Sequence, residues 1–495
     1  MIFAQPSIAR QWSVLLIACL LAGCAAVGRQ GEHGAATLSL EDCQLSAPGI
    51  SIRMAARCGR LVVPENRQPG DSKPIELFTA VIPAISRSPA PDPLFILAGG
   101  PGQAASESYL QLSGAFERIH QKRDIVLVDQ RGTGKSAPLE CSSQDETGTQ
   151  PEQEQQIRQC LDQFQGDPRQ YTTWVAAADL DQVRQALGYG KINLYGVSYG
   201  TRAALTYLKL FPDQVRTVIL DGVVPQDTSL GLNEARYAQQ ALDAIFARCA
   251  SEPACSQAFP RVDQEFQQLM QQLKQAPRDV TLPDPVSGEV TRLEITPERM
   301  ATTIRLLSYT PETAALIPLL IHHTAASQDY RLMASQYLIL VGQLANSISN
   351  GVSLSVLCSE DIPFFTPAQA AQANQDTYLG TSLSDDMFKI CEIWPHDPAP
   401  KGFKDPVHSE TPALLLSGAA DPVTPAENAS RVLEVFPNGI SVVAPGQGHN
   451  LIFRGCIPRL AAQFIEEGTT RGLDTGCVEE IKAMPFFVNY SGPQP

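Results

Sequence analysis

The sequence predicts an α/β fold with a mostly parallel central sheet that is interrupted by a large helical insertion. Short apolar runs alternate with helical segments in the first half of the 495-residue chain, which is typical of βαβ units. From about residue 226 to 404, apolar residues recur at helical spacing and no strand–helix alternation is evident. The alternation returns near the C-terminus, so both ends of the chain are expected to build one sheet.

Each element follows from these patterns. In the first half, apolar runs bounded by glycine or polar residues predict strands at 60–64, 74–83, 93–100, 124–129, 191–195 and 217–221. Helices are expected at 173–187 and 201–211, the second of which ends at Pro212. The insertion is expected to form helices at 232–248, 261–276, 297–307, 311–327 and 332–349. The last part is expected to hold strands at 411–417 and 440–444 and a helix at 426–435.

The first 23 residues are expected to be a lipoprotein signal peptide. Arg10 supplies positive charge, and the apolar run at 13–23 is shorter than the about 20 residues that span a bilayer. The run ends in Leu-Ala-Gly-Cys at 21–24, which resembles a bacterial lipobox and makes Cys24 the expected lipidation site. An ordinary secretory signal is the alternative. Lipidation predicts an exported cell-envelope lipoprotein that faces the periplasm or the cell surface.

Five segments define the expected domain organisation. They are a signal peptide at 1–23, a polar tether at 24–42, the first part of the α/β core at 43–225, a helical cap at 226–404 and the C-terminal part of the core at 405–495. The cap therefore separates two parts of one sheet.

Ten cysteines follow Cys24, and their even number agrees with export. No CxxC spacing typical of a metal or redox site occurs in the sequence. In an oxidising compartment the simplest hypothesis is five disulfides between sequence neighbours, although the sequence leaves the connectivity open. These residues are Cys43, Cys58, Cys141, Cys160, Cys249, Cys255, Cys358, Cys391, Cys456 and Cys477.

The charge of the chain excludes one class of partner. There are 37 basic and 52 acidic residues, which give a net charge of −15, and no cluster of lysine and arginine. Nucleic-acid binding needs concentrated positive charge beside the phosphates, so we expect no nucleic-acid partner.

Gly196-Val197-Ser198-Tyr199-Gly200 is the sharpest motif. GxSxG by itself is weak, but here it lies between an apolar strand and an Ala/Leu-rich helix, which is the context that a nucleophile elbow requires. The glycines permit a sharp turn that exposes the serine near a helix N-terminus. We therefore expect Ser198 to be a catalytic nucleophile.

A serine nucleophile needs a base, and the base needs an orienting acid. Of the seven histidines, only His449 follows a late apolar strand, which fits the Ser…acid…His order of α/β-hydrolases. Asp421 follows the strand before it and is the expected acid, while Asp221, at the end of an earlier strand, is the rival. The predicted triad is Ser198, Asp421 and His449.

An acyl-transfer enzyme also needs an oxyanion hole of two backbone N–H donors. The amide of Tyr199, directly after the nucleophile, is the first expected donor. The second is expected from the GGPG turn at 99–102, where Pro101 has no N–H; Gly100 is therefore favoured and Gly99 is the reserve.

Several motifs together resemble the proline iminopeptidase and tripeptidyl aminopeptidase family of α/β-hydrolase serine peptidases. They are GGPG at 99–102, DQRGTGKS at 129–136, GVSYG at 196–200, DPVTP at 421–425 and a late Gly-His at 448–449. The resemblance spans about residues 58–477 and implies an α/β-hydrolase fold with a helical cap over the active site and a TAP-like C-terminal region. Iminopeptidases usually have histidine where this chain has Ala98, which favours the tripeptidyl branch.

DQRGTGKS lacks the GxxxxGK spacing of a phosphate-binding loop, so Asp129 and Arg131 are expected to brace the loops around the nucleophile. The resemblance also implies that cap carboxylates hold the free α-amino group of the substrate. Glu360 and Asp361, after Cys358, and Glu392, after Cys391, are the candidates, and solvated surface acids are the alternative. No metal or organic cofactor is implied.

The predicted function is a secreted, lipid-anchored serine exopeptidase that removes amino acids or short peptides from peptide N-termini. The tripeptidyl type is favoured, with a peptide as substrate and a membrane contact through the lipid. A carboxylesterase or lipase with the same triad is the alternative, and it would have an apolar channel instead of amine-binding acids. A non-catalytic binding module is a third hypothesis, against which the intact serine, histidine and aspartate argue.

Overall fold

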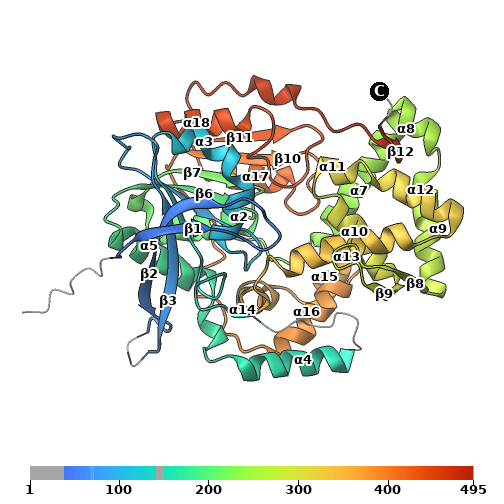
Figure 1. Cartoon of the computed structure of the whole chain (residues 1–495), viewed down its shortest axis with the longest axis horizontal. Helices are drawn as coiled ribbons and strands as arrows, with labels where there is room; N and C mark the ends of the chain where they lie inside the picture. Colours follow the sequence, from blue (N-terminus) through green and yellow to red (C-terminus); the bar gives the residue numbers. More distant parts are fainter. Residues whose placement is uncertain (1–37, 69, 71, 141–149, 494–495) are drawn as a thin grey trace, which may run out of the picture. The chain divides into compact units, whose positions relative to one another are not determined.

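The computed structural model describes residues 38–68, 70, 72–140 and 150–493 (Figure 1). The expected signal peptide and Cys24 lie outside the described residues, as does Cys141. None of the helices in the described part combines the length and the apolar character needed to cross a membrane.

The core of the described chain is a nine-stranded sheet in the order β1-β2-β3-β5-β4-β6-β7-β10-β11. The first three strands pair antiparallel, and the strands from β5 to β11 pair parallel, which confirms the predicted mostly parallel sheet. The strands are β1 (Glu41–Leu45), β2 (Met54–Pro64), β3 (Pro74–Ile82), β4 (Leu94–Leu97), β5 (Ile125–Val128), β6 (Ile192–Val197), β7 (Val215–Asp221), β10 (Ala413–Gly418) and β11 (Gly439–Ala444).

Helices cover both faces of this sheet because its central strands are buried on both sides. One apolar cluster joins the sheet to α2, α3 and α18, and a second joins the opposite face to α5, α6 and α17. These helices are α2 (Ala105–Leu112), α3 (Glu117–His120), α5 (Thr173–Ala186), α6 (Tyr199–Leu210), α17 (Ala426–Leu433) and α18 (Ile457–Glu467).

The N-terminal edge of the sheet differs from the prediction. Strand β1 begins at Glu41, inside the range predicted to be a tether, and β2 begins at Met54, before the predicted start at residue 60. Neither stretch has a continuous apolar run, so the sequence pattern gives little sign of a strand. Pairing between the two strands and a disulfide between Cys43 and Cys58 hold them at the edge of the sheet.

The inserted part of the chain is mainly helical, as predicted. Its helices are α7 (Glu234–Ser251), α8 (Pro253–Ala258), α9 (Val262–Gln275), α10 (Pro297–Leu307), α11 (Pro311–Ala314), α12 (Ile317–Ser327), α13 (Arg331–Ala345), α14 (Asn350–Glu360), α15 (Pro367–Ala373) and α16 (Ser382–Ile393). The remaining described elements are α4 (Gln150–Gln163), the short 3₁₀ turns η2 (Ser113–Phe116), η3 (Pro168–Gln170), η4 (Pro212–Gln214), η5 (Ile362–Phe364) and η6 (Gly476–Glu480), and the C-terminal strands β12 (Phe487–Asn489) and β13 (Gly492–Pro493).

Two features of the insertion were not predicted. An antiparallel hairpin, β8 (Arg278–Pro283) and β9 (Val290–Ile295), interrupts the helices, and only alternate side chains of each strand are buried. The helix predicted at 311–327 is divided into α11 and α12, because Pro318 lies in the first turn of α12.

Disulfides in the described part join neighbouring cysteines, as predicted. The bridges are Cys43–Cys58, Cys249–Cys255, Cys358–Cys391 and Cys456–Cys477. Cys160 is also disulfide-bonded.

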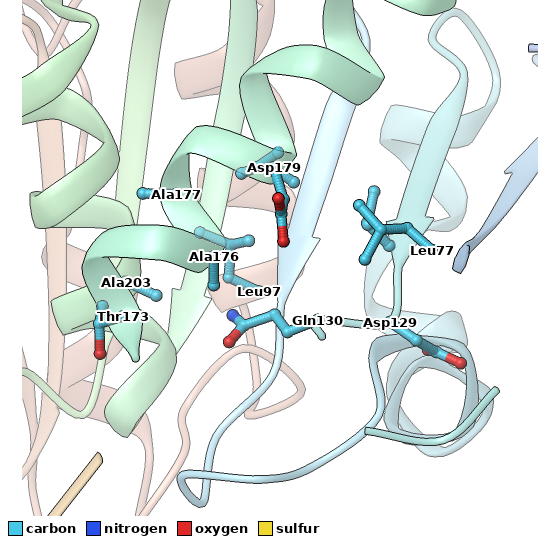
Figure 2. A pocket seen from close by; sticks show the side chains of 11 residues that line it. Leu77, Leu97, Asp129, Gln130, Thr173, Ala176, Ala177, Asp179 and Ala203 are labelled. Carbon is cyan, nitrogen blue, oxygen red and sulfur yellow. The ribbon is translucent and has the colours of Figure 1, made fainter. Parts of the chain in front are cut away.

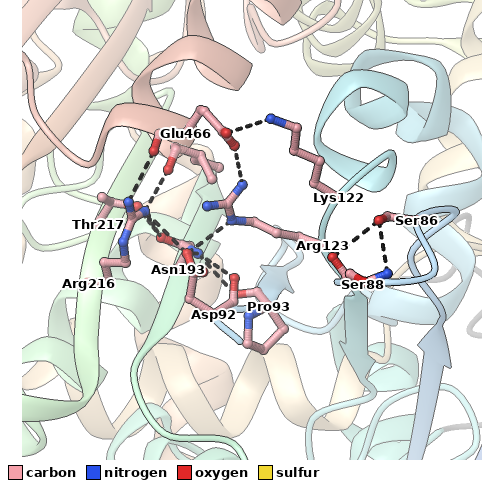
Figure 3. Close-up of polar contacts among 11 residues, drawn as sticks. Ser86, Ser88, Asp92, Pro93, Lys122, Arg123, Asn193, Arg216, Thr217 and Glu466 are labelled. Carbon is pink, nitrogen blue, oxygen red and sulfur yellow. Dashed lines mark hydrogen bonds and ion pairs between the residues drawn. The ribbon is translucent and has the colours of Figure 1, made fainter. Parts of the chain in front are cut away.

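A polar network fixes the amino ends of three central strands (Figure 3). The Arg123 guanidinium donates to Asp92, just before β4, and to Glu466 on α18. Asn193, at the start of β6, donates to Asp92 and accepts from Thr217 of β7. This network lies at the end of the strands opposite to the end from which the candidate catalytic loops emerge, so it stabilises the sheet on which those loops depend.

Candidate active site

Ser198 lies in a sharp turn between β6 and α6. Its backbone has φ 55° and ψ −125°, a conformation that non-glycine residues rarely adopt and that is frequent at functional sites. The Ser198 amide donates to the carbonyl of Asp221 on β7, at 2.8 Å, and Thr201 donates to the Ser198 carbonyl. The turn is therefore fixed by the neighbouring strand and by the helix that it begins.

The two glycines of the motif are required by close backbone approach. A Cβ atom on Gly196 would lie 2.3 Å from the carbonyl oxygen of Gly200, and a Cβ on Gly200 would lie 2.2 Å from that of Leu97. Neither contact is possible without moving backbone, so helix α6 can pack this closely against β4 and β6 only with glycine at both positions.

His449 and Asp421 are joined by a hydrogen bond at the carboxyl ends of the strands. Nδ1 of His449 lies 2.8 Å from Oδ2 of Asp421 and 3.1 Å from Oγ1 of Thr424, whose hydroxyl also donates to the carboxylate. The amides of Val423 and Thr424 donate to the other carboxylate oxygen. Asp421 is therefore held in one orientation, and it orients the imidazole.

The electrostatics of this pair follow from its burial. Desolvation raises the pKa of Asp421, but the nearby imidazole and the hydrogen bonds outweigh it and leave the pKa below its usual value. Desolvation also lowers the pKa of His449, and the charge and hydrogen bond of Asp421 outweigh it, so that the net pKa is raised.

Asp221, the alternative candidate for the catalytic acid, binds backbone amides of a neighbouring loop. It accepts from the amides of Leu451 and Ile452, at 2.7 and 2.9 Å, and from the hydroxyl of Tyr195. Its oxygens therefore hold the loop that follows His449, whereas the imidazole is hydrogen-bonded to Asp421. Burial raises the pKa of Asp221 against these hydrogen bonds.

The imidazole lies beside the end of β7, the strand that pairs with the nucleophile's strand β6. A Cβ atom on Gly222, directly after Asp221, would be 3.0 Å from Cε1 of His449. Since Ser198 is bonded through its amide to Asp221, the serine and the histidine lie over adjacent strand ends. In the described part, the hydrogen bonds of the imidazole involve only Nδ1, and Nε2 has no partner.

The predicted oxyanion donors surround the same serine. Tyr199 is the first residue of α6, so its amide has no acceptor within the helix. In the GGPG turn, a Cβ atom on Gly99 would be 3.3 Å from Cβ of Ser198, and Gly100 has a positive φ of 105° that favours glycine. The structure thus brings together the turn and the helix N-terminus on which the prediction depends.

Asp129 and Arg131 brace neighbouring loops, as predicted. Asp129 is fully buried and accepts from the amide and hydroxyl of Ser106, at the start of α2, and from the amide of Lys135. The Arg131 guanidinium forms two hydrogen bonds with Asp179 of α5, at 2.6 and 2.8 Å. A small apolar cavity lies beside them (Figure 2). It is lined mostly by aliphatic core side chains, among them Leu77, Leu97, Val128, Ala176, Ala177 and Ala203.

The three acids predicted to bind an amine have different surroundings. Asp361 is fully buried and contacts two cations, Arg202 and Lys404, each at 2.9 Å. Glu360 is buried and accepts from the amide and hydroxyl of Thr173, both at 2.6 Å, and burial raises its pKa to about 7. Glu392 is exposed. The Cys358–Cys391 bridge is present, but Asp361 and Glu360 are bonded to other side chains and Glu392 is exposed.

Two other charged residues near the site were missed. Glu234, at the start of α7, is buried and has a carboxylate oxygen without a hydrogen-bond partner in the described part. Arg305, on α10, has a buried Nε atom that also lacks a partner among the described residues. Both residues lie on helices that the sequence analysis predicted from apolar spacing alone, and neither residue belongs to a recognisable motif. The signal that identifies them is unpartnered burial, which only coordinates reveal.

Comparison with known proteins gives the family. Residues 92–279 match the alpha/beta hydrolase fold family, and residues 376–477 match the TAP-like protein family. The chain is an alpha/beta hydrolase with a TAP-like C-terminal region. This alpha/beta hydrolase is similar to the serine protease Hip1 of Mycobacterium tuberculosis, with 24% identity over 86% of this chain and 88% of that protein.

Two further relatives agree with this assignment. The alpha/beta hydrolase is 24% identical to the putative hydrolase YuaR of Escherichia coli, over 85% of this chain and 89% of that protein. It is 30% identical to tripeptidyl aminopeptidase of Streptomyces lividans over a shorter region, 38% of each chain. It thus belongs with the serine peptidases of the TAP/Hip1 family.

Proposed function

We propose that this serine peptidase is an exopeptidase that releases short units, with tripeptides favoured, from the free N-termini of peptides. The observation that carries the proposal is the buried His449–Asp421 hydrogen bond beside the strained turn of Ser198. The tripeptidyl preference is supported by the similarity to tripeptidyl aminopeptidase and by Ala98 before the GGPG turn.

The mechanism follows from the positions of these groups. Nε2 of His449 takes the proton of the Ser198 hydroxyl as the oxygen attacks the substrate carbonyl. The amide of Tyr199 and an amide of Gly99 or Gly100 stabilise the oxyanion. Asp421 stabilises the imidazolium, which then protonates the leaving amine. Water, activated by the same imidazole, releases the acyl group and restores the serine.

For the free amino group of the substrate, Glu234 is better suited than the three acids predicted from the sequence. A buried cation needs a paired anion, and Glu234 has an oxygen without a partner in the described part of the chain. The oxygens of Asp361 are already paired with Arg202 and Lys404, and Glu360 is bonded to Thr173. Glu392, on α16, is exposed, so it does not need a paired cation.

An esterase or lipase of the same fold remains the second candidate because it needs the same triad. The two differ in their dependence on a free amine. We therefore propose comparing tripeptidyl and aminoacyl anilides with the same compounds blocked at the amine, with Ser198→Ala as the inactive control. The exopeptidase proposal expects a loss of at least about a hundredfold in kcat/KM on blocking, because a buried carboxylate would lose its partner. Equal rates would favour the esterase.

We also propose that the chain is exported and anchored through a lipid on Cys24. The lipobox-like sequence and the disulfides of the described part support this proposal. Incorporation of a labelled fatty acid in the producing cell, compared between the wild-type chain and Cys24→Ala, tests it. Equal labelling of both would contradict the anchor.

A further inference from the structure

Arg305 is an arginine without a counter-ion at short range. In the described part of the chain, no hydrogen bond or ion pair within 4.0 Å includes its guanidinium, and its Nε atom is buried. Buried cations in proteins are normally paired, because an unpaired charge loses its hydration without compensation. Against the effect of burial, the negative charge of Glu234 favours the protonated form of Arg305 and raises its pKa, but the two side chains form no ion pair in the described part. Arg305 therefore retains unused donors.

Its place in the fold connects Arg305 to the catalytic base. The guanidinium carbon lies 5.9 Å from the ring centroid of Tyr309, one turn further along the chain. The Tyr309 ring packs edge-on against the imidazole of His449, at 5.6 Å between centroids, and its carbonyl accepts from the His449 amide at 2.7 Å. Tyr309 thus lies between the base and the arginine and contacts both.

This order of groups indicates which part of a substrate Arg305 faces. The imidazole receives the proton of the nucleophile on one side and delivers it to the leaving group. Tyr309 packs on this imidazole and Arg305 packs on Tyr309, so we infer that Arg305 is nearer to the leaving part of a bound substrate than to its acyl part. A guanidinium there is suited to a carboxylate, which it can bind through two parallel hydrogen bonds.

We propose that Arg305 is a specificity-determining residue that binds a carboxylate on the leaving part of the substrate. The inference rests on the proposed peptidase function and names the substrate class that this function prefers. The carboxylate comes either from an aspartate or glutamate directly after the scissile bond or from the C-terminus of a short peptide. In both cases the ligand chemistry is the same, and the substrate would supply the hydrogen-bonded counter-ion that no side chain in the described part of the chain provides.

The test compares substrates that differ only after the scissile bond. One pair carries glutamate or glutamine at the position after the cleaved bond, with the C-terminus amidated. The other pair has alanine there, with a free or an amidated C-terminus. Mass analysis of the products gives the cleavage position, and kcat/KM is measured for each peptide. Because hydrogen bonds to charged groups contribute more than those to neutral groups, the charged member of at least one pair should be preferred by roughly 10- to 100-fold.

Variants assign this preference to the arginine. Arg305→Met should reduce the ratio of charged to neutral rates to about one, and Arg305→Lys should keep part of it because the charge remains. Arg299→Met is the matched control: it lies on the same helix, donates to the carbonyl of Glu294 and packs over Tyr337, and it should keep the wild-type ratio. Thermal unfolding of each variant verifies that it is folded.

The outcomes separate the inference from the proposed function. If no free-amine peptide or anilide is cleaved, the peptidase proposal itself is wrong. If peptides are cleaved but the wild-type enzyme shows equal rates within both pairs, or if Arg305→Met retains the preference, the assignment of Arg305 is overturned. If Arg305→Met does not fold, equal wild-type rates within both pairs still overturn the assignment. If the wild-type enzyme does show the preference, a reduced preference in Arg305→Lys supports the assignment and an unchanged one overturns it.

Discussion

Nδ1 of His449 lies 2.8 Å from Oδ2 of Asp421, and both side chains are buried. This contact predicts the pH dependence of catalysis. The net effect of the carboxylate is to raise the pKa of His449 above 6.5, against the opposing effect of burial. The base must be neutral to accept a proton, so kcat/KM should fall as the pH falls through a midpoint above 6.5.

The measurement is a pH profile of kcat/KM with a free-amine anilide. The substrate's own α-amine titrates at about pH 7.7–8.0, so its pKa is measured separately and included in the fit. Asp421→Asn should lower kcat by about 10³–10⁴-fold, because an amide cannot stabilise the imidazolium. A wild-type midpoint clearly below 6.5 would contradict the raised pKa.

The same pair predicts that stability responds to pH in the opposite direction. The raised pKa of His449 contributes stability that is fully present below about 6.5 and is lost as the pH rises through its folded-state pKa. The lowered pKa of Asp421 contributes stability present above about 3.8 and lost as the pH falls through its folded-state pKa. The difference in Tm between the wild-type chain and His449→Ala should therefore be largest between about pH 4 and 6.5 and smaller at pH 9. A difference that grows with pH would contradict this.

Asp421 and Asp221 have different roles, and substitutions should distinguish them. Asp421 orients the imidazole of His449, whereas Asp221 holds the loop that follows His449. Asp221→Asn replaces an acceptor of two backbone amides with a group that can donate, and a buried amide left without an acceptor costs about 1–3 kcal/mol. We expect a lower Tm and a modest loss of kcat. Asp421→Asn should show the reverse, a severe loss of kcat with a smaller change in Tm. Identical behaviour of both variants would argue against the assignment of Asp421 as the acid.

Gly196 and Gly200, the glycines of the nucleophile turn, should not tolerate a larger side chain. Gly200→Ala places a Cβ atom 2.2 Å from the carbonyl oxygen of Leu97, so helix α6 must move away from the sheet. We expect destabilisation of about 3 kcal/mol or more and loss of activity. Gly342→Ala on α13, where a Cβ atom meets nothing within 4 Å, is the control and should be neutral or stabilising. Chemical denaturation of the two variants checks the comparison.

These results show which parts of the molecule could be predicted from the sequence. The parallel strands were identified because they are buried on both faces and therefore read as continuous apolar runs. The hairpin of β8 and β9 was missed because it is short, half exposed and surrounded by helices. Strand β1 was missed because its residues, from Glu41 to Leu45, carry no apolar pattern and depend on pairing with β2.

The residues of the candidate site also fall into two groups, those that the sequence could predict and those that it could not. Ser198 and His449 were identified because their loops carry local motifs that the turn geometry demands. Glu234 and Arg305 were not identified, because what distinguishes them is a buried polar atom without a partner in the described part of the chain, and a sequence does not record missing partners. The pairing of neighbouring cysteines predicted the Cys358–Cys391 bridge, but the sequence could not reveal that Arg202 and Lys404 already neutralise Asp361.

That neutralisation leads to a last prediction, which distinguishes a structural carboxylate from one that binds substrate. Asp361 accepts from Arg202 with both oxygens and also contacts Lys404, and the Arg202 and Asp361 side chains are fully buried. Asp361→Asn would leave buried cations without compensation and should cost about 3–5 kcal/mol of unfolding free energy. Asp279→Asn, which breaks an exposed ion pair with Arg292 on the cap hairpin, is the control and should change stability little. A variant Asp361→Asn with unchanged Tm but a strongly raised KM for free-amine substrates would instead identify Asp361 as an amine-binding acid.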